Sequence, residues 1–182
     1  KHRGPDGAGY RQSDTADQRY QVSLGHRRLS IIDLEGGAQP MWSADGSIGL
    51  VFNGELYNYI ELREELNSLG HTFRTSSDTE VLIEAYRAWG VDSIKRFRGM
   101  FAFGLWDARA QQLVLARDPF GKKPLFIAEN AGLLFASEIE PLLQFPGMNT
   151  SIDPHAVEHY LLNRYVPGPR RSEERRVGKE CR

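Results

Sequence analysis

Apolar residues along the chain follow two spacings, and these predict strands in blocks on either side of a block of helices. Runs typical of strands cover 21–26, 29–34, 48–53, 99–107, 112–118, 124–128 and 132–138. Helical spacing covers 57–69, 78–90, 139–145 and 154–163, with a short helix near 91–97. The brief connections at 107–112 and 129–132 are typical of antiparallel hairpins. This order predicts an α+β fold in which helices cover antiparallel sheets.

One Asn-Gly pair stands where a strand gives way to a helix. The stretch LVFNGELYNYI carries Asn53 and Gly54 directly after an apolar run. Asn-Gly is typical of a hairpin turn, but a helical pattern follows here instead of a second strand. We therefore expect strand, Asn-Gly, helix, with the Gly54 N–H and the Asn53 amide able to point at a ligand.

Composition limits the classes of protein that the chain can be. It has 182 residues, 40% of them hydrophobic and 26% charged, with a formal net charge of −1. No basic stripe, apolar span or signal peptide is present in the sequence, so we expect no nucleic-acid partner, no membrane partner and a cytoplasmic location. The length fits one domain and leaves a homodimer open as its assembly.

The two ends of the chain differ from its body. The sequence starts at Lys1 without an initiator methionine, so we expect it to begin inside a domain that covers residues 1–170. Residues 171–182 show no apolar period and resemble a translated sequencing adapter. They include Cys181, the only cysteine, so we expect no disulfide and no metal site in the body.

Three weak patterns describe a single ligand when they are taken together. Asp78 stands at a predicted helix start, where capping alone would explain it, yet a carboxylate there can also hold an ammonium group. Arg28 looks like a surface charge, yet its guanidinium can bind a carboxylate through two hydrogen bonds. With Asn53-Gly54 as donors to a carbonyl, these residues match a free amino acid.

Two other patterns do not support a site. The stretch GKKPL lacks the spacing of a phosphate-binding loop, so Lys122 and Lys123 are better read as a turn before a strand. His155 and His159 are four residues apart on a predicted helix, but no acidic third ligand is placed beside them. We expect them to lie on a surface helix face.

Several longer motifs occur in a recognisable order: HRGPDG, LGHRRLSIIDL, GGAQPM, FNGELYNY, TSSDTEV, GMFAFGLWD, ARDPFGKKPL and FASEI. The set resembles the class II glutamine amidotransferase domain of glutamine-dependent asparagine synthetases, over residues 1–170. The resemblance implies an N-terminal-nucleophile fold, a four-layer αββα sandwich of antiparallel sheets.

The resemblance also implies the role of each site residue. Arg28 would hold the α-carboxylate of L-glutamine and Asp78 its α-ammonium, while Asn53 and Gly54 would form the oxyanion hole. The remaining lining residues would be Leu29, Ser30, Ile31, Ile32 and Glu55. The domain itself would need no cofactor or metal.

In this family the nucleophile is a cysteine at the mature N-terminus, and its own α-amine is the general base. No such cysteine stands at the start of this chain, so we expect the chain as given to bind glutamine poorly and to hydrolyse none. We also expect the family's synthetase domain, which would bring ATP and Mg²⁺ and convert aspartate to asparagine, to lie outside this chain. Two alternatives stay open: a related amidotransferase with another acceptor, in cell-surface polysaccharide or peptide modification, and a non-catalytic ligand-binding module.

Overall fold

A computed structural model describes residues 4–29, 36–129 and 132–166. Its residues divide into two compact units, Lys1–Lys123 and Pro124–Arg182, which are described separately. Within the described residues, all pairing between strands is antiparallel and helices pack on the sheets, which confirms the α+β prediction. None of their helices has the length and apolar character to span a membrane.

The first unit holds a two-stranded sheet, a four-stranded sheet and a group of helices. The hairpin sheet consists of β1 (Gly7–Asp14) and β2 (Gln21–Arg28). The larger sheet, in the order β3-β4-β5-β6, consists of β3 (Met41–Trp42), β4 (Ile48–Leu56), β5 (Gly99–Asp107) and β6 (Gln112–Arg117). The helices are α1 (Tyr59–Ser68), α2 (Asp78–Trp89) and the 3₁₀ helix η1 (Gly90–Arg96).

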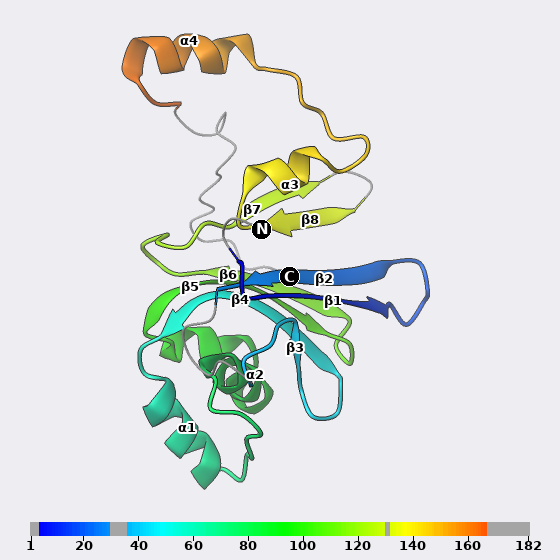
Figure 1. Ribbon diagram of the computed structural model, residues 1–182, viewed down its shortest axis with the longest axis vertical. Helices are drawn as coiled ribbons and strands as arrows, with labels where there is room; N and C mark the ends of the chain where they lie inside the picture. Colours follow the sequence, from blue (N-terminus) through cyan, green and yellow to red (C-terminus); the bar gives the residue numbers. More distant parts are fainter. Residues whose placement is uncertain (1–3, 30–35, 130–131, 167–182) are drawn as a thin grey trace. The chain divides into compact units, whose positions relative to one another are not determined.

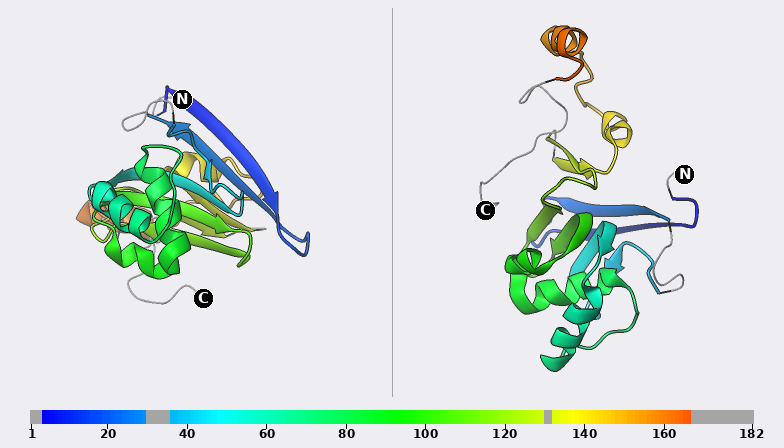
Figure 2. Two further views of the ribbon diagram at one scale, coloured as in Figure 1. Left: turned by 90° about the horizontal axis from the view of Figure 1, so that it is seen from below. Right: turned by 90° about the vertical axis from the view of Figure 1, so that its left-hand side faces the viewer.

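Three layers are visible in this unit. The helices cover one face of the four-stranded sheet, and the β1–β2 hairpin lies against the other face (Figure 1 and Figure 2). Side chains alternate between these two faces along each strand. On β4, the buried Leu50, Phe52 and Leu56 belong to the core shared with the helices. Asn53 and Glu55 therefore project toward the hairpin.

The hairpin sheet turns the alternate residues of β2 toward the larger sheet. Leu24 is fully buried and His26 and Arg28 are half-buried, whereas the intervening Gly25 and Arg27 are exposed. Since β2 packs against β4, the inward side chains of β2 and the odd-numbered side chains of β4 occupy the same inter-sheet layer.

The strand β1 was not predicted from the sequence. Its residues GAGYRQSD include no Val, Ile, Leu or Phe, and each of them is exposed or half-buried, so the strand has no buried apolar face. The strand exists because it pairs with β2 along its full length, from Gly7 opposite Arg28 to Asp14 opposite Gln21. The prediction for residues 30–34 falls outside the described residues.

The end of β4 also differs from the prediction. Asn53 and Gly54 were expected to terminate the strand, but β4 continues through both residues to Leu56 and stays paired with β5. The pair is therefore neither a hairpin turn nor a strand end. The following helix α1 begins at Tyr59, two residues later than the pattern suggested.

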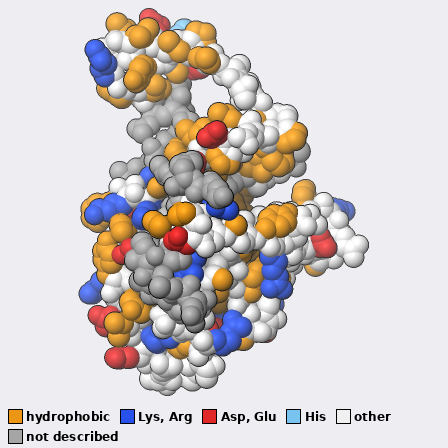
Figure 3. All heavy atoms as spheres, viewed as in Figure 1, with side chains coloured by type: hydrophobic (Ala, Val, Ile, Leu, Met, Phe, Trp, Pro, Cys, Tyr) orange, Lys and Arg blue, Asp and Glu red, His pale blue; other side chains and the backbone are white. Residues whose placement is uncertain are grey.

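The second unit contains a small sheet and two helices. These elements are β7 (Phe126–Glu129), β8 (Leu133–Ala136), α3 (Ile139–Leu143) and α4 (Pro154–Asn163). The two strands pair and α3 packs against β8. No residue of α4 is buried, and hydrophobic side chains such as Tyr160 and Leu161 gather on its surface (Figure 3). His155 and His159 are exposed on this helix, as expected.

Candidate functional site

The candidate site lies where β4 and β5 extend beyond their flanking strands. On one side, pairing between β3 and β4 ends at Met41 opposite Leu50. On the other, pairing between β5 and β6 ends at Ala102 opposite Arg117. The pair β4–β5 continues further, to Leu56 opposite Gly99. The segment Asn53–Leu56 therefore has β5 on one edge and, among the described residues, no partner strand on the other, which we call the open edge.

The direction of the backbone N–H groups follows from this register. The N–H of Tyr57 donates to the carbonyl of Arg98 on the β5 side, at 2.7 Å. Neighbouring N–H groups point to opposite sides of a strand, so those of Phe52, Gly54 and Leu56 point away from β5. Two of these three have side-chain acceptors: Gln39 Oε1 for Phe52, at 2.6 Å, and Asp78 Oδ2 for Leu56, at 3.1 Å. The Gly54 N–H lies between them on the open edge.

Gly54 is a glycine because β5 comes very close to it. Its φ is 156°, and a Cβ built there would lie 2.1 Å from the carbonyl oxygen of Met100. A side chain at this position would force the two strands apart. The close approach fixes the Gly54 peptide against β5, and no other described strand pairs with its opposite edge.

Asp78 is the first residue of α2, and the residues before it hold it in place. Ser77 is the N-cap, and its Oγ accepts the N–H of Thr79 at 3.2 Å. Arg63 of α1 donates to the carbonyls of Thr75 and Ser77, at 2.7 and 3.1 Å. Because Ser77 fulfils the capping role, Asp78 is not needed as the cap, and its carboxylate reaches across to β4 instead.

The carboxyl group of Asp78 is buried, with a residue exposure of 5%. Burial raises its pKa above the ordinary value of 3.8, and the negative charge of Glu55 raises it further, while the N–H groups of Leu56 and Thr79 lower it in part. The structure therefore brings Asp78 and Glu55 close together at the end of β4. A cationic group bound here would relieve the unfavourable burial of this charge.

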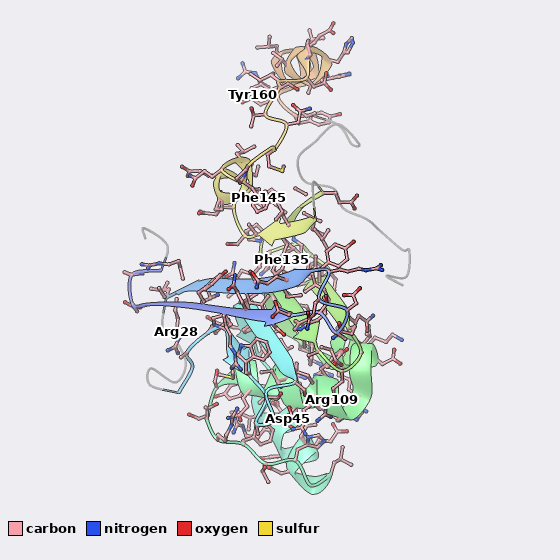
Figure 4. All side chains as sticks on the ribbon, turned by 90° about the vertical axis from the view of Figure 1, so that its right-hand side faces the viewer. Arg28, Asp45, Arg109, Phe135, Phe145 and Tyr160 are labelled. Carbon is pink, nitrogen blue, oxygen red and sulfur yellow. The ribbon has the colours of Figure 1, made fainter. Side chains whose placement is uncertain are left out.

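Arg28 is the residue expected to bring a positive charge to the site. It is the last residue of β2, at the open end of the hairpin, and its half-buried side chain faces the inter-sheet layer (Figure 4). Burial lowers the pKa of the neighbouring His26 to about 4, and the charge of Arg28 contributes to this shift. His26 is therefore neutral at pH 7.

The other expected lining residues are placed less fully. Leu29 follows β2 and is exposed, whereas Ser30, Ile31 and Ile32 lie outside the described residues. The structure thus brings Asn53, Gly54, Glu55 and Asp78 together around the end of β4, with Arg28 on the strand that packs against it. Among the described residues, no group of three or more His, Cys, Asp or Glu side chains could hold a metal ion.

Two residues that support this segment were not among those expected at the site. Gln39 accepts the Phe52 N–H, and the buried Asp118 accepts the N–H of Phe101, which pairs with Gly54 across the sheet. Both contacts join residues more than ten positions apart. Local spacing could not have found them, although both lie in motifs of the family, GGAQPM and ARDPFGKKPL.

Comparison with known proteins identifies the family. The family model described as "Glutamine amidotransferase domain" matches residues 1–179. Asparagine synthetase [glutamine-hydrolyzing] 1 of Bacillus subtilis is 46% identical over 169 residues, which cover 92% of this chain and 26% of that protein. A putative asparagine synthetase [glutamine-hydrolyzing] of Mycobacterium bovis is 46% identical over 179 residues, covering 93% and 27%. The chain thus spans about a quarter of the length of these relatives.

Solved structures show the same fold. The glutamine phosphoribosylpyrophosphate amidotransferase of B. subtilis, in complex with ADP and GMP, matches with a TM-score of 0.60 and 25% identity, over 76% of this chain and 37% of that chain. A second structure, titled as the allosteric regulatory enzyme of purine biosynthesis, has a TM-score of 0.59 and 26% identity, with the same coverage. These matches confirm the expected N-terminal-nucleophile fold class. The chain belongs to the glutamine amidotransferase domain family.

Proposed function

We propose that this chain is the glutaminase part of an asparagine synthetase that takes its nitrogen from glutamine. The observation that carries the proposal is the Gly54 N–H, which lies on an open strand edge between two N–H groups that already have side-chain acceptors. Asp78 and Arg28, with opposite charges, stand on elements that pack against the same strand. This arrangement suits an amino acid whose side-chain carbonyl reaches Gly54.

In the proposed reaction, Arg28 binds the α-carboxylate of L-glutamine and Asp78 binds its α-ammonium. The thiolate of an N-terminal cysteine, supplied by residues outside this chain, attacks the side-chain amide carbon. The carbonyl oxygen becomes an oxyanion, which the Gly54 N–H and the Asn53 side chain stabilise. The C–N bond then breaks, and the α-amine of the cysteine delivers the proton that lets ammonia leave. Water cleaves the resulting thioester to glutamate and restores the thiol.

The ammonia acceptor is assigned by the relatives alone. Those described above are named as asparagine synthetases, which favours aspartate as the acceptor over polysaccharide or peptide substrates. ATP and Mg²⁺ would act in the synthetase part of the protein, and glutamine hydrolysis itself needs neither. The partner of this domain is then the synthetase part of the same protein.

The proposal is tested with the full-length protein read from the complete gene. We expect it to release ammonia from L-glutamine, to lose this activity when its N-terminal cysteine is replaced by alanine, and to form asparagine from aspartate with ATP. Absence of glutamine-dependent ammonia release would refute the glutaminase assignment. Ammonia release without any asparagine would refute only the acceptor.

A further inference from the structure

Gln39 stands where β3 leaves the four-stranded sheet. The last paired residue of β3 is Met41, opposite Leu50, so a continued β3 would place the backbone of residue 39 opposite Phe52. Backbone pairing has already ended at Met41, and the Gln39 side chain accepts the Phe52 N–H instead, with its Oε1 2.6 Å from the Phe52 nitrogen. The side-chain carbonyl of Gln39 thus takes the place of a β3 backbone acceptor for the Phe52 N–H, directly before Asn53.

The opposite edge of the sheet ends in a similar way. Beyond the pair of Ala102 and Arg117, the Asp118 N–H donates to the Phe101 carbonyl at 2.8 Å, and Asp118 Oδ2 accepts the Phe101 N–H at 3.3 Å. Phe101 is the residue that pairs with Gly54. β3 therefore stops at the level of Leu50 and β6 at the level of Asn53, and a side-chain oxygen beyond each end accepts a backbone N–H of the sheet, that of Phe52 or Phe101.

Gln39 is also held by its other neighbours. Its Nε2 lies 3.5 Å from Oγ1 of the buried Thr79, which follows Asp78 in α2. A Cβ added to Gly9 of β1 would lie 2.0 Å from the Gln39 carbonyl oxygen, so the β1 backbone packs directly against this residue. One side chain therefore connects the open edge of β4 to the start of the helix that carries Asp78.

We propose that Gln39 is a positioning residue for glutamine hydrolysis, one that sets the direction of the Gly54 N–H. The inference rests on the proposed function. The bond to Phe52 N–H and the bond from Leu56 N–H to Asp78 fix the open edge on both sides of Gly54. Without the bond between Gln39 and the Phe52 N–H, the open edge would be held only at Leu56. A donor misplaced by about 1 Å can cost roughly 100-fold in rate.

The test compares Gln39→Met with Gln111→Met in the full-length protein. Gln111 is a matched control, because its Oε1 also accepts a backbone N–H, that of Ala16 at 2.7 Å, at the far end of the hairpin sheet. For Gln39→Met we expect kcat for glutamine hydrolysis to fall about 10- to 100-fold, with KM within about threefold of the wild-type value. Hydrogen exchange should accelerate in the segment 52–56 and remain unchanged elsewhere. Gln111→Met should keep both kinetic constants.

A second variant separates positioning from folding. Gln39→Glu keeps an oxygen that can accept the Phe52 N–H. Residues 52–56 should therefore stay protected from hydrogen exchange, and kcat should stay within about fivefold of the wild-type value. The inference is overturned if Gln39→Met folds with an unchanged kcat, or if Gln39→Glu keeps the protection yet loses as much kcat as expected for Gln39→Met. Should the wild-type protein release no ammonia, the proposed function fails, whereas the exchange data still report whether Gln39 holds this edge.

Discussion

Replacing Asp118 by asparagine should strongly destabilise the first unit, whereas the same change at Asp78 should not. The two carboxyl groups are similarly buried, with residue exposures of 3% and 5%. Their surroundings differ, however. The carboxylate of Asp118 accepts four backbone N–H groups, from Phe101, Phe120, Lys122 and Lys123. Burial alone would raise the pKa of Asp118, but these four donors outweigh burial and hold it below 3.8.

The size of the effect follows from the bonding pattern of Asp118. Each carboxylate oxygen accepts two of the four N–H groups. Asparagine has one oxygen, so two N–H groups would face its NH₂ group and lose their acceptor. An unsatisfied buried donor costs about 1–3 kcal/mol, but the bonds from Phe120, Lys122 and Lys123 are only part-buried, so we expect a loss of about 2–3 kcal/mol in the free energy of unfolding.

Asp78→Asn should leave the unit at least as stable as the wild type near pH 7. The asparagine oxygen can still accept the Leu56 N–H, while the substitution removes a buried charge next to Glu55. Folding raises the pKa of Asp78, so this group reduces stability above the raised pKa, and the reduction disappears as the pH falls below 3.8. Folding lowers the pKa of Asp118, so that residue contributes stability above pH 3.8 that is lost on acidification through the lowered pKa.

Urea unfolding followed by tryptophan fluorescence would measure both effects. All three tryptophans, Trp42, Trp89 and Trp106, lie in the first unit, so the fluorescence reports on it alone. We expect Asp118→Asn to lower the unfolding midpoint at pH 7 and Asp78→Asn to keep or raise it. If Asp78→Asn destabilised the unit as much as Asp118→Asn, Asp78 would be a structural carboxylate, and its assignment to substrate would lose its energetic support.

Three further predictions concern the site. Arg28→Ala should raise KM for glutamine about 10- to 150-fold, because charge-assisted hydrogen bonds to the substrate are lost, while Arg27→Ala, on the exposed face of β2, should leave KM unchanged. Equal effects of the two variants on KM in steady-state kinetics would contradict the orientation of β2. Asn53→Ala should lower kcat about 100- to 1000-fold with little change in KM, and an unchanged kcat would remove it from the oxyanion hole. Gly54→Ala should lower the free energy of unfolding in urea by about 1–3 kcal/mol, because its Cβ would lie 2.1 Å from the Met100 oxygen. Gly25→Ala should be tolerated, because its Cβ would lie 3.7 Å from the Tyr10 ring, and equal stability of the two variants would count against the close approach of β4 and β5.

The parts of the fold that the sequence predicted well are those whose own residues determine them. The strand β5 covers the predicted residues 99–107, because its apolar run is buried at the centre of the sheet. The helix α2 begins at the predicted Asp78, since Ser77 caps it and its apolar face is buried. The helix α4 likewise covers the predicted 154–163, starting after the N-cap Asp153.

The parts that were missed depend on contacts between distant residues. The polar strand β1 forms only because β2 lies beside it. The Asn53-Gly54 pair suggested a strand end, but β5 continues to pair with both residues. The supporting bonds of Gln39 and Asp118 likewise become visible only when β3 and β6 are seen to stop short of the ends of β4 and β5.

A crystal structure of the full-length protein with L-glutamine bound, its N-terminal cysteine replaced by alanine, would show whether the substrate lies along the open edge of β4. We expect the α-carboxylate within about 2.7–3.2 Å of the Arg28 guanidinium, the α-ammonium at the same range from Asp78, and the side-chain carbonyl oxygen facing the Gly54 N–H. Glutamine bound away from the open edge of β4, or with its side chain directed away from Gly54, would contradict the account.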